Sequence, residues 1–206
     1  MRKADKALYL AKEKGKNRHI IYEERLHGKL ESDDMQNMAM AYAVSKEKKR
    51  EVITKMITEL CVSGVNSIVK KEERLQQIRS LFDLDGITIY SESGAQLVCR
   101  NGNYMVEVPD GRGIFEDEKY LALFGDDDNF IESNTLKLRS QDPAAFAVMQ
   151  KQEIGASLQC LSRKEGVPNV IVNYDVFNRN RKWSDEDITL LTILGHCIGN
   201  LLNYSE

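Results

Sequence analysis

Residues 152–204, QEIGASLQCLSRKEGVPNVIVNYDVFNRNRKWSDEDITLLTILGHCIGNLLNY, decide the fold of this chain. Two apolar-rich segments, residues 153–162 and 170–177, predict strands, and the polar residues between them predict a hairpin connection over 163–169. After a basic turn, Ser184 stands three residues before Asp187, the spacing at which a serine hydroxyl accepts N–H groups of a first helical turn. The order strand, strand, capped helix predicts the end of a domain built on an antiparallel sheet.

The segment after this cap predicts a helix that packs on that sheet. Three acidic residues in its first turn favour the positive end of the helix dipole. Its apolar residues recur with a 3.6-residue period, which gives a stripe broad enough to cover a sheet. They are Ile188, Leu191, Leu194, Ile198, Leu201 and Leu202.

Residues 154–202 resemble the C-terminal half of a GAF domain, in which two core strands precede a W/F-S-x-E-D turn and a final helix. The resemblance implies an α+β fold, an α/β sandwich with an antiparallel sheet flanked by N- and C-terminal helices. It also implies a small-molecule sensor that is often dimeric. The fold by itself names no ligand.

The first residues carry a second resemblance. ADKALYLAKEKGKNRHIIY, residues 4–22, is similar to the last helix and strand of a GGDEF domain, the diguanylate cyclase fold, which commonly ends ADxALYxAKxxGRNRxxxY. In that family a lysine and an arginine at these places contact the triphosphate of GTP, and they correspond to Lys12 and Lys16. Lys16 departs from the pattern, because lysine offers a point charge where arginine offers a fork.

The signature GG(D/E)EF loop and the metal-binding carboxylates of that family are missing from the sequence. One helix and one strand cannot perform phosphoryl transfer, which needs metal and positioning together. We therefore expect no enzyme activity in this chain and a non-functional role for Lys12 and Lys16. The resemblance implies a parent protein of the diguanylate cyclase type, and we expect Met1 to mark a truncation of it.

These resemblances divide the chain into three parts: residues 1–22 as the C-terminal fragment of a GGDEF domain, 23–50 as a linker or signalling helix, and 51–206 as the GAF domain. Ser32 and Asp33 favour the start of a helix within the linker. Two further helical stripes follow over residues 51–83. The resemblance implies that such helices join a homodimer, and the alternative that they pack only on their own sheet stays open.

The middle of the chain predicts strands over 86–91, 95–101 and 104–108, a short helix over 116–124, a further strand over 130–138 and a helix over 142–152 opened by Pro143. Asp126, Asp127 and Asp128 lack the alternating ligand spacing of a calcium loop, so a solvated acidic loop is predicted, without a metal site.

The overall composition favours a soluble, cytoplasmic protein. The chain has 206 residues with 42% hydrophobic and 30% charged residues, which allows one full domain and extra material. The net charge of -3 argues against general binding of nucleic acid or of a membrane surface. Four scattered cysteines, Cys61, Cys99, Cys160 and Cys197, have no metal-ligand spacing and are predicted to be reduced core residues.

Side-chain alternation along the predicted strands places polar residues on one face of the sheet. This candidate ligand-binding face comprises Thr88, Tyr90, Ser157, Gln159, Asn173 and Asp175. Residues 104–140 would cover it as a lid over an unknown small molecule, and no cofactor is evident. The alternative is that this face is simply wet, as antiparallel sheets permit.

The sequence thus predicts a regulatory GAF sensor of a cyclic-di-GMP signalling protein, which passes a ligand signal through dimeric helices to a linked or partner GGDEF domain. One alternative is a module that dimerises without a ligand. A remote alternative is a reductase that uses Cys99 and Cys160, chemistry that requires an accessible thiolate of low pKa.

Overall fold

The computed structural model describes residues 32–63, 72–92, 94–100 and 111–203. The chain divides into two compact units, Met1–Glu51 and Val52–Glu206, and the second unit holds the sheet. Its helices and strands, in chain order, are the end of α3 (Ser32–Ser63), α5 (Glu72–Leu81), β1 (Gly86–Ser91), β2 (Gly94–Arg100), η1 (Arg112–Glu116), α6 (Glu118–Leu121), β3 (Asn129–Glu132), η2 (Thr135–Lys137), α7 (Leu138–Gln141), α8 (Pro143–Lys151), β4 (Ile154–Lys164), β5 (Val167–Phe177) and α9 (Asp185–Asn203).

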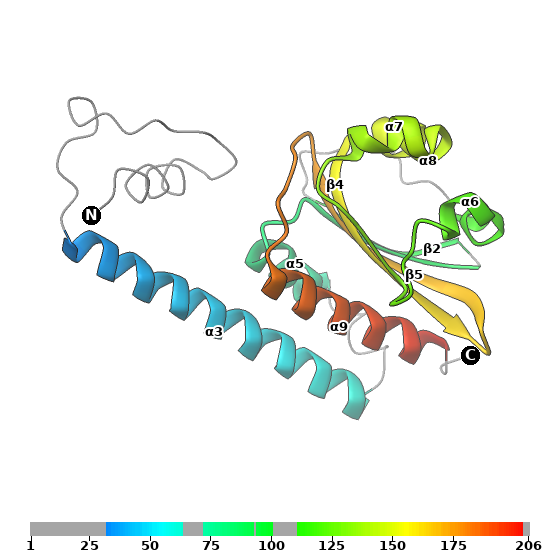
Figure 1. Ribbon diagram of the computed structural model, residues 1–206. Helices are drawn as coiled ribbons and strands as arrows, with labels where there is room; N and C mark the ends of the chain where they lie inside the picture. Colours follow the sequence, from blue (N-terminus) through cyan, green and yellow to red (C-terminus); the bar gives the residue numbers. More distant parts are fainter. Residues whose placement is uncertain (1–31, 64–71, 93, 101–110, 204–206) are drawn as a thin grey trace. The chain divides into compact units, whose positions relative to one another are not determined.

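The five described strands form one antiparallel sheet in the order β2-β1-β5-β4-β3. Figure 1 shows α5 and α9 against one face of this sheet and α6, α7 and α8 over the other. The expected α+β fold, an antiparallel sheet with flanking helices, is therefore confirmed. The expected N-terminal helix and strand, the strand over 104–108 and the first residues of the expected lid lie outside the described residues.

The main hydrophobic core lies between α3, α5 and α9 and the face of the sheet that these helices cover. Buried residues of β1, β4 and β5 pack there against one stripe each of α3, α5 and α9. From the helices they include Ile53, Met56, Leu60, Leu75, Ile78, Leu191, Leu194 and Ile198, which agrees with the predicted stripes. A smaller cluster on the opposite face joins α6, α7 and α8 to the sheet through Phe124, Leu138, Met149, Leu161, Ile171 and Phe177.

The hairpin between β4 and β5 is tighter than the sequence predicts. Lys164 pairs with Val167, so Glu165 and Gly166 alone form the turn instead of the expected connection over 163–169. Both turn residues have positive φ, 53° and 86°, as a two-residue hairpin with the sheet's twist requires. The sequence did not indicate that the two strands extend to Lys164 and Val167, because the end of the hairpin is exposed on both faces and its composition is largely polar.

The corner between β5 and α9 follows the prediction. The Ser184 hydroxyl accepts the backbone N–H of Asp187 at 3.1 Å, which caps α9. Trp183 is buried, and its indole N–H donates to the Glu132 carbonyl at 3.3 Å. The corner therefore fixes both the start of α9 and the end of β3.

Other expectations need correction. The expected strand over 130–138 ends at Glu132 and continues as η2 and α7, because Asn134 caps η2 by accepting the N–H of Leu136. Cys99 and Cys160 are core residues, but Cys61 is exposed and Cys197 is partly exposed. Apolar periodicity predicted burial for Cys61, and it failed because this residue lies near the end of α3, beside the exposed Val62. None of the described helices is long and apolar enough to cross a membrane.

Replacement of Gly195 by alanine is expected to lower the free energy of unfolding by about 1–3 kcal/mol, the usual cost of overpacking a core. A Cβ atom there would lie 2.6 Å from the Cys160 sulfur and 2.8 Å from its Cβ, so α9 must move off β4. Urea denaturation measures the change, with the exposed Asn200→Ala on the same helix as the control. Equal stability of Gly195→Ala and wild type would contradict the close packing of α9 on β4.

Candidate functional site

The six polar residues expected to share a sheet face do share it. Thr88 lies opposite Asn173 in the pairing of β1 with β5, and Gln159 lies opposite Asn173 in the pairing of β4 with β5. Ser157 likewise pairs with Asp175. All six side chains are buried, so this face is covered and is not an exposed side of the sheet. Burial makes their hydrogen-bond partners the decisive question.

Half of this face satisfies its own hydrogen bonds. The Ser157 hydroxyl donates to the Asp175 carboxylate at 2.6 Å and accepts from the Gln159 amide nitrogen at 3.1 Å. The Tyr120 hydroxyl, on α6, donates to the Gln159 amide oxygen at 2.6 Å. This chain connects a carboxylate within the sheet to a helix that covers it.

Two further residues of this face, Thr88 and Asn173, are not satisfied from within the described residues. The Thr88 hydroxyl oxygen and the Asn173 side-chain oxygen are buried and have no hydrogen-bond partner there. Buried polar atoms are usually paired, so an exception needs an explanation. The two residues are direct cross-strand partners, which places both unpaired groups at one point of the face.

Asp175 is the acidic group at the centre of this face. Burial raises the pKa of its carboxyl from 3.8 to about 6, and the Ser157 hydrogen bond and the Arg100 charge oppose this rise. Arg100 donates to the Gln152 side chain at 2.8 Å, and its guanidinium lies 5.1 Å from the centre of the Phe177 ring. Arg100 thus connects the end of β2 to Gln152 and to the Phe177 ring, and its charge also acts on Asp175.

A cavity of about 250 Å³ opens above this face. Three of the six candidate residues, Tyr90, Gln159 and Asn173, line it. Thr88, Ser157 and Asp175 lie on the same face but do not line the cavity. The remaining walls come from η1, α6, α8 and the segments beside them: Gly111, Gly113, Ile114, Asp117, Tyr120, Ala144, Ala145, Val148, Met149, Gln152 and Ile154.

The described cavity lining carries no basic side chain, and its single carboxylate, Asp117, accepts the N–H groups of Lys119 and Tyr120 as the cap of α6. Burial raises the pKa of both lining tyrosines, Tyr90 and Tyr120, so both are neutral near pH 7. The polar groups that remain for a ligand are uncharged amides and hydroxyls.

Gly111 closes one side of the cavity against Tyr90. Its backbone has φ of 79°, and a Cβ atom there would lie 2.2 Å from the Tyr90 ring. Only glycine combines this conformation with such a close approach. The backbone of Gly111 therefore packs directly on the ring that forms the cavity wall.

Sequence reasoning missed Tyr120, Gln152 and Arg100. Tyr120 lies on a four-residue helix, too short to show a period, and Gln152 follows the last turn of α8. Arg100 ends the edge strand β2. No sequence pattern indicates that these residues converge, because their partners lie 39 and 52 residues away. Lys12 and Lys16 lie outside the described residues.

The acidic loop is held by ordinary structural contacts. Asp128 forms an ion pair with Arg163 at 2.8 Å, and Asp127 accepts the backbone N–H of Asn129. Within the described ranges, no group of three or more histidine, cysteine or acidic residues is arranged to hold a metal ion.

Several solved structures are similar to this fold. The phycoerythrobilin-bound GAF domain of a cyanobacterial phytochrome matches with a TM-score of 0.58 and 10% identity, over 79% of this chain and 97% of that one. The chromophore-binding domain of the Stigmatella aurantiaca bacteriophytochrome also matches with a TM-score of 0.58, with 14% identity, over 78% of this chain and 61% of that one. The far-red-absorbing dark state of JSC1_58120g3 with bound biliverdin IXa matches with a TM-score of 0.54 and 13% identity, over 75% of this chain and 98% of that one.

These likenesses establish the fold as GAF-like. At such low identity they carry the fold and not the ligand. No protein-family model matches the sequence, and no curated protein sequence matches it either.

Proposed function

We propose that this chain is a sensory GAF module that binds a small uncharged molecule in the cavity over the polar face of the sheet. The observation that carries the proposal is Asn173, which is only 6% exposed, lines the cavity, and has a side-chain oxygen without a partner among the described residues. A ligand N–H or O–H group would supply the missing donor.

The cavity also limits the chemistry of its ligand. Its volume of about 250 Å³ lies below the 300–1,000 Å³ of typical small-molecule pockets, which suits a ligand of a single ring. A phosphate or carboxylate would meet no basic side chain on the described walls. The ligand class supported best is a neutral ring compound that offers a donor for the Asn173 oxygen beside an acceptor for the second N–H of the Gln159 amide, whose first N–H is bonded to Ser157.

A thermal-shift experiment tests this proposal with matched pairs of neutral and anionic compounds, namely uracil with orotate and nicotinamide with nicotinate. A neutral compound present at about 100 times its dissociation constant should add about 2.7 kcal/mol to the free energy of unfolding. The anionic partners should bind at least about tenfold more weakly, because desolvation of their charge finds no compensation.

The variant Asn173→Val serves as the control in that experiment. It removes the unpaired buried acceptor, so it should raise the stability of the ligand-free protein by about 1–3 kcal/mol and abolish the shift with neutral compounds. Equal shifts in wild type and Asn173→Val would place binding elsewhere. No shift with any compound, together with a stable dimer in sedimentation, would favour a module that dimerises without a ligand.

The similarity of residues 4–22 to the end of a GGDEF domain supports a further proposal, that this module regulates a diguanylate cyclase in a cytoplasmic cyclic-di-GMP signalling protein. A homodimer formed by its helices would carry the signal between linked domains. Cyclase activity of a complete GGDEF domain joined to this module, measured with and without the neutral compounds, tests this link, and activity that does not respond to a bound compound would exclude it.

The remote alternative of a cysteine-dependent reductase is disfavoured. Cys99 and Cys160 lie in the helix-covered core, on the face opposite the cavity. Burial raises the pKa of the Cys160 thiol, so the reactive thiolate would be rare there.

A further inference from the structure

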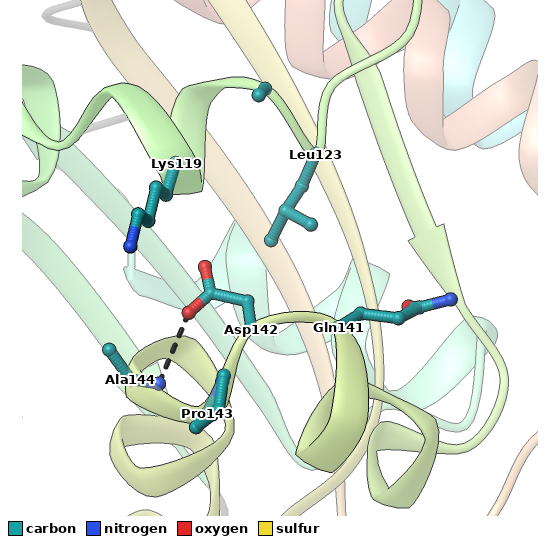
Figure 2. A pocket seen from close by; sticks show the side chains of 7 residues that line it. Lys119, Leu123, Gln141, Asp142, Pro143 and Ala144 are labelled. Carbon is teal, nitrogen blue, oxygen red and sulfur yellow. Dashed lines mark hydrogen bonds between the residues drawn. The ribbon is translucent and has the colours of Figure 1, made fainter.

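A second pocket, of about 670 Å³, lies between α6 and the junction of α7 with α8. Figure 2 shows the side chains that line it: Lys119, Ala122, Leu123, Gln141, Asp142, Pro143 and Ala144. Only Ala144 is shared with the cavity over the sheet. The second pocket therefore presents its own set of side chains.

Asp142 is the buried polar residue of this pocket, with 6% of its surface exposed. One carboxylate oxygen accepts the backbone N–H groups of Ala144 and Ala145, both at 3.1 Å, and so caps α8. The second oxygen is buried and has no hydrogen-bond partner among the described residues. In Figure 2 this oxygen points away from α8, toward the side of the pocket from which Lys119 and Leu123 extend.

Helix capping does not explain the second oxygen. An asparagine would cap α8 equally well, since a cap needs one acceptor. The positive end of the helix dipole stabilises the negative charge but supplies no donor to the oxygen that faces away from the helix. A buried carboxylate oxygen in this position lacks a partner that a ligand could provide.

The opposite charge lies on the facing wall. Lys119 is exposed and lines the same pocket, yet none of the ion pairs in the described part of the chain joins it to Asp142. The surfaces near these two groups are apolar, from Ala122, Leu123 and Pro143. The pocket thus offers one negative group, one positive group and an apolar surface near them.

We propose that this second pocket binds a small zwitterion of the amino-acid class with an aliphatic side chain. The ligand ammonium group donates to the free Asp142 oxygen, its carboxylate pairs with Lys119, and its side chain contacts Leu123 and Pro143. Lys119, a long exposed side chain, moves aside to admit the ammonium group. This site is independent of the cavity over the sheet and goes beyond the sensory role proposed for it.

Calorimetric titration of the whole chain with L-leucine, L-valine and L-alanine tests the proposal. Leucine methyl ester lacks the carboxylate, and N-acetyl-leucine lacks the ammonium group, so each should bind at least about tenfold more weakly than leucine, the effect of losing one charge-assisted contact. Asp142→Asn keeps the cap acceptor and removes the charge, and it should weaken leucine binding by at least about tenfold.

Two more variants make the outcome decisive. Lys119→Gln, on an exposed side chain that no cap requires, should weaken leucine binding while leucine methyl ester binding stays unchanged. Asn173→Val, in the cavity over the sheet, should leave leucine binding unchanged, which separates this site from the proposed sensory one. The proposal is overturned if none of the three amino acids gives saturable binding, or if leucine binds wild type, Asp142→Asn and Lys119→Gln with equal affinity.

Discussion

Asp175→Asn is expected to be more stable than wild type at pH 7.5, by about 3 kcal/mol. The wild-type carboxyl has a pKa of about 6 in the folded protein and 3.8 as its reference value, and each unit of difference corresponds to about 1.4 kcal/mol. Asparagine carries no charge that burial could penalise, and its oxygen can still accept the Ser157 hydroxyl.

The sign of the pH dependence follows from the raised pKa. Between about pH 4 and pH 6 the folded state holds a proton that the unfolded state has lost, so the stability of wild type falls as the pH rises through this range. Above about pH 6 the loss is complete and constant. The advantage of Asp175→Asn should thus be near zero at pH 4 and full at pH 7.5.

Urea denaturation of both proteins at these two pH values measures the effect. The exposed Asp126→Asn is the matched control and should show no comparable gain. If Asp175→Asn loses stability at pH 7.5, the buried carboxylate is stabilised by its surroundings, and the described desolvation of Asp175 is wrong.

Trp183→Ala is expected to destabilise the protein by about 3–5 kcal/mol, the usual cost of removing a buried aromatic side chain. Trp183 is 5% exposed, packs in the core under the helices, and donates its indole N–H to the Glu132 carbonyl. The Arg181 guanidinium lies 4.4 Å from its ring centre. Loss of the Trp183 side chain would remove the contact that joins the end of β3 to the segment before α9.

Chemical denaturation followed by circular dichroism measures this loss. Trp183→Phe keeps most of the ring but loses the N–H donor, so it should fall between Trp183→Ala and wild type. Lys182→Ala, an exposed neighbour, is the control and should change stability by less than about 0.5 kcal/mol. A cost for Trp183→Ala as small as that of Lys182→Ala would show that the corner does not depend on this side chain.

The fold was largely predictable because the decisive elements are long and periodic. The predicted apolar stripe is confirmed, because Leu191, Leu194 and Ile198 are all buried. The predicted alternation around Asn173 agrees with the register of β4 and β5. Each pattern depends on burial along one regular element, which a sequence records directly. The hairpin turn at Glu165 and Gly166 was misjudged because its strands lose their alternation where they leave the core.

Of the candidate site, only the residues on the sheet face were predictable from the sequence. The sheet face that carries Thr88, Ser157 and Asn173 follows from strand alternation. The other walls of the cavity come from short helical segments. One of their residues, Tyr120, donates a hydrogen bond to Gln159, which lies 39 residues later in the sequence. Pro143 predicts the start of α8, but nothing local indicates that Asp142 caps this helix or that its second carboxylate oxygen is buried. These contacts depend on tertiary packing, which leaves no hydrophobic periodicity in a single sequence.

The central claim is that a neutral molecule binds beside Asn173, and NMR spectroscopy of the side-chain amide groups tests it most directly. Titration of the labelled chain with uracil and with nicotinamide should shift the side-chain NH₂ signals of Asn173 and Gln159 in a saturable way for at least one compound, and orotate and nicotinate should leave them unchanged. If neither neutral compound moves these signals, or if the anions move them equally, the account of an uncharged ligand in this cavity is contradicted.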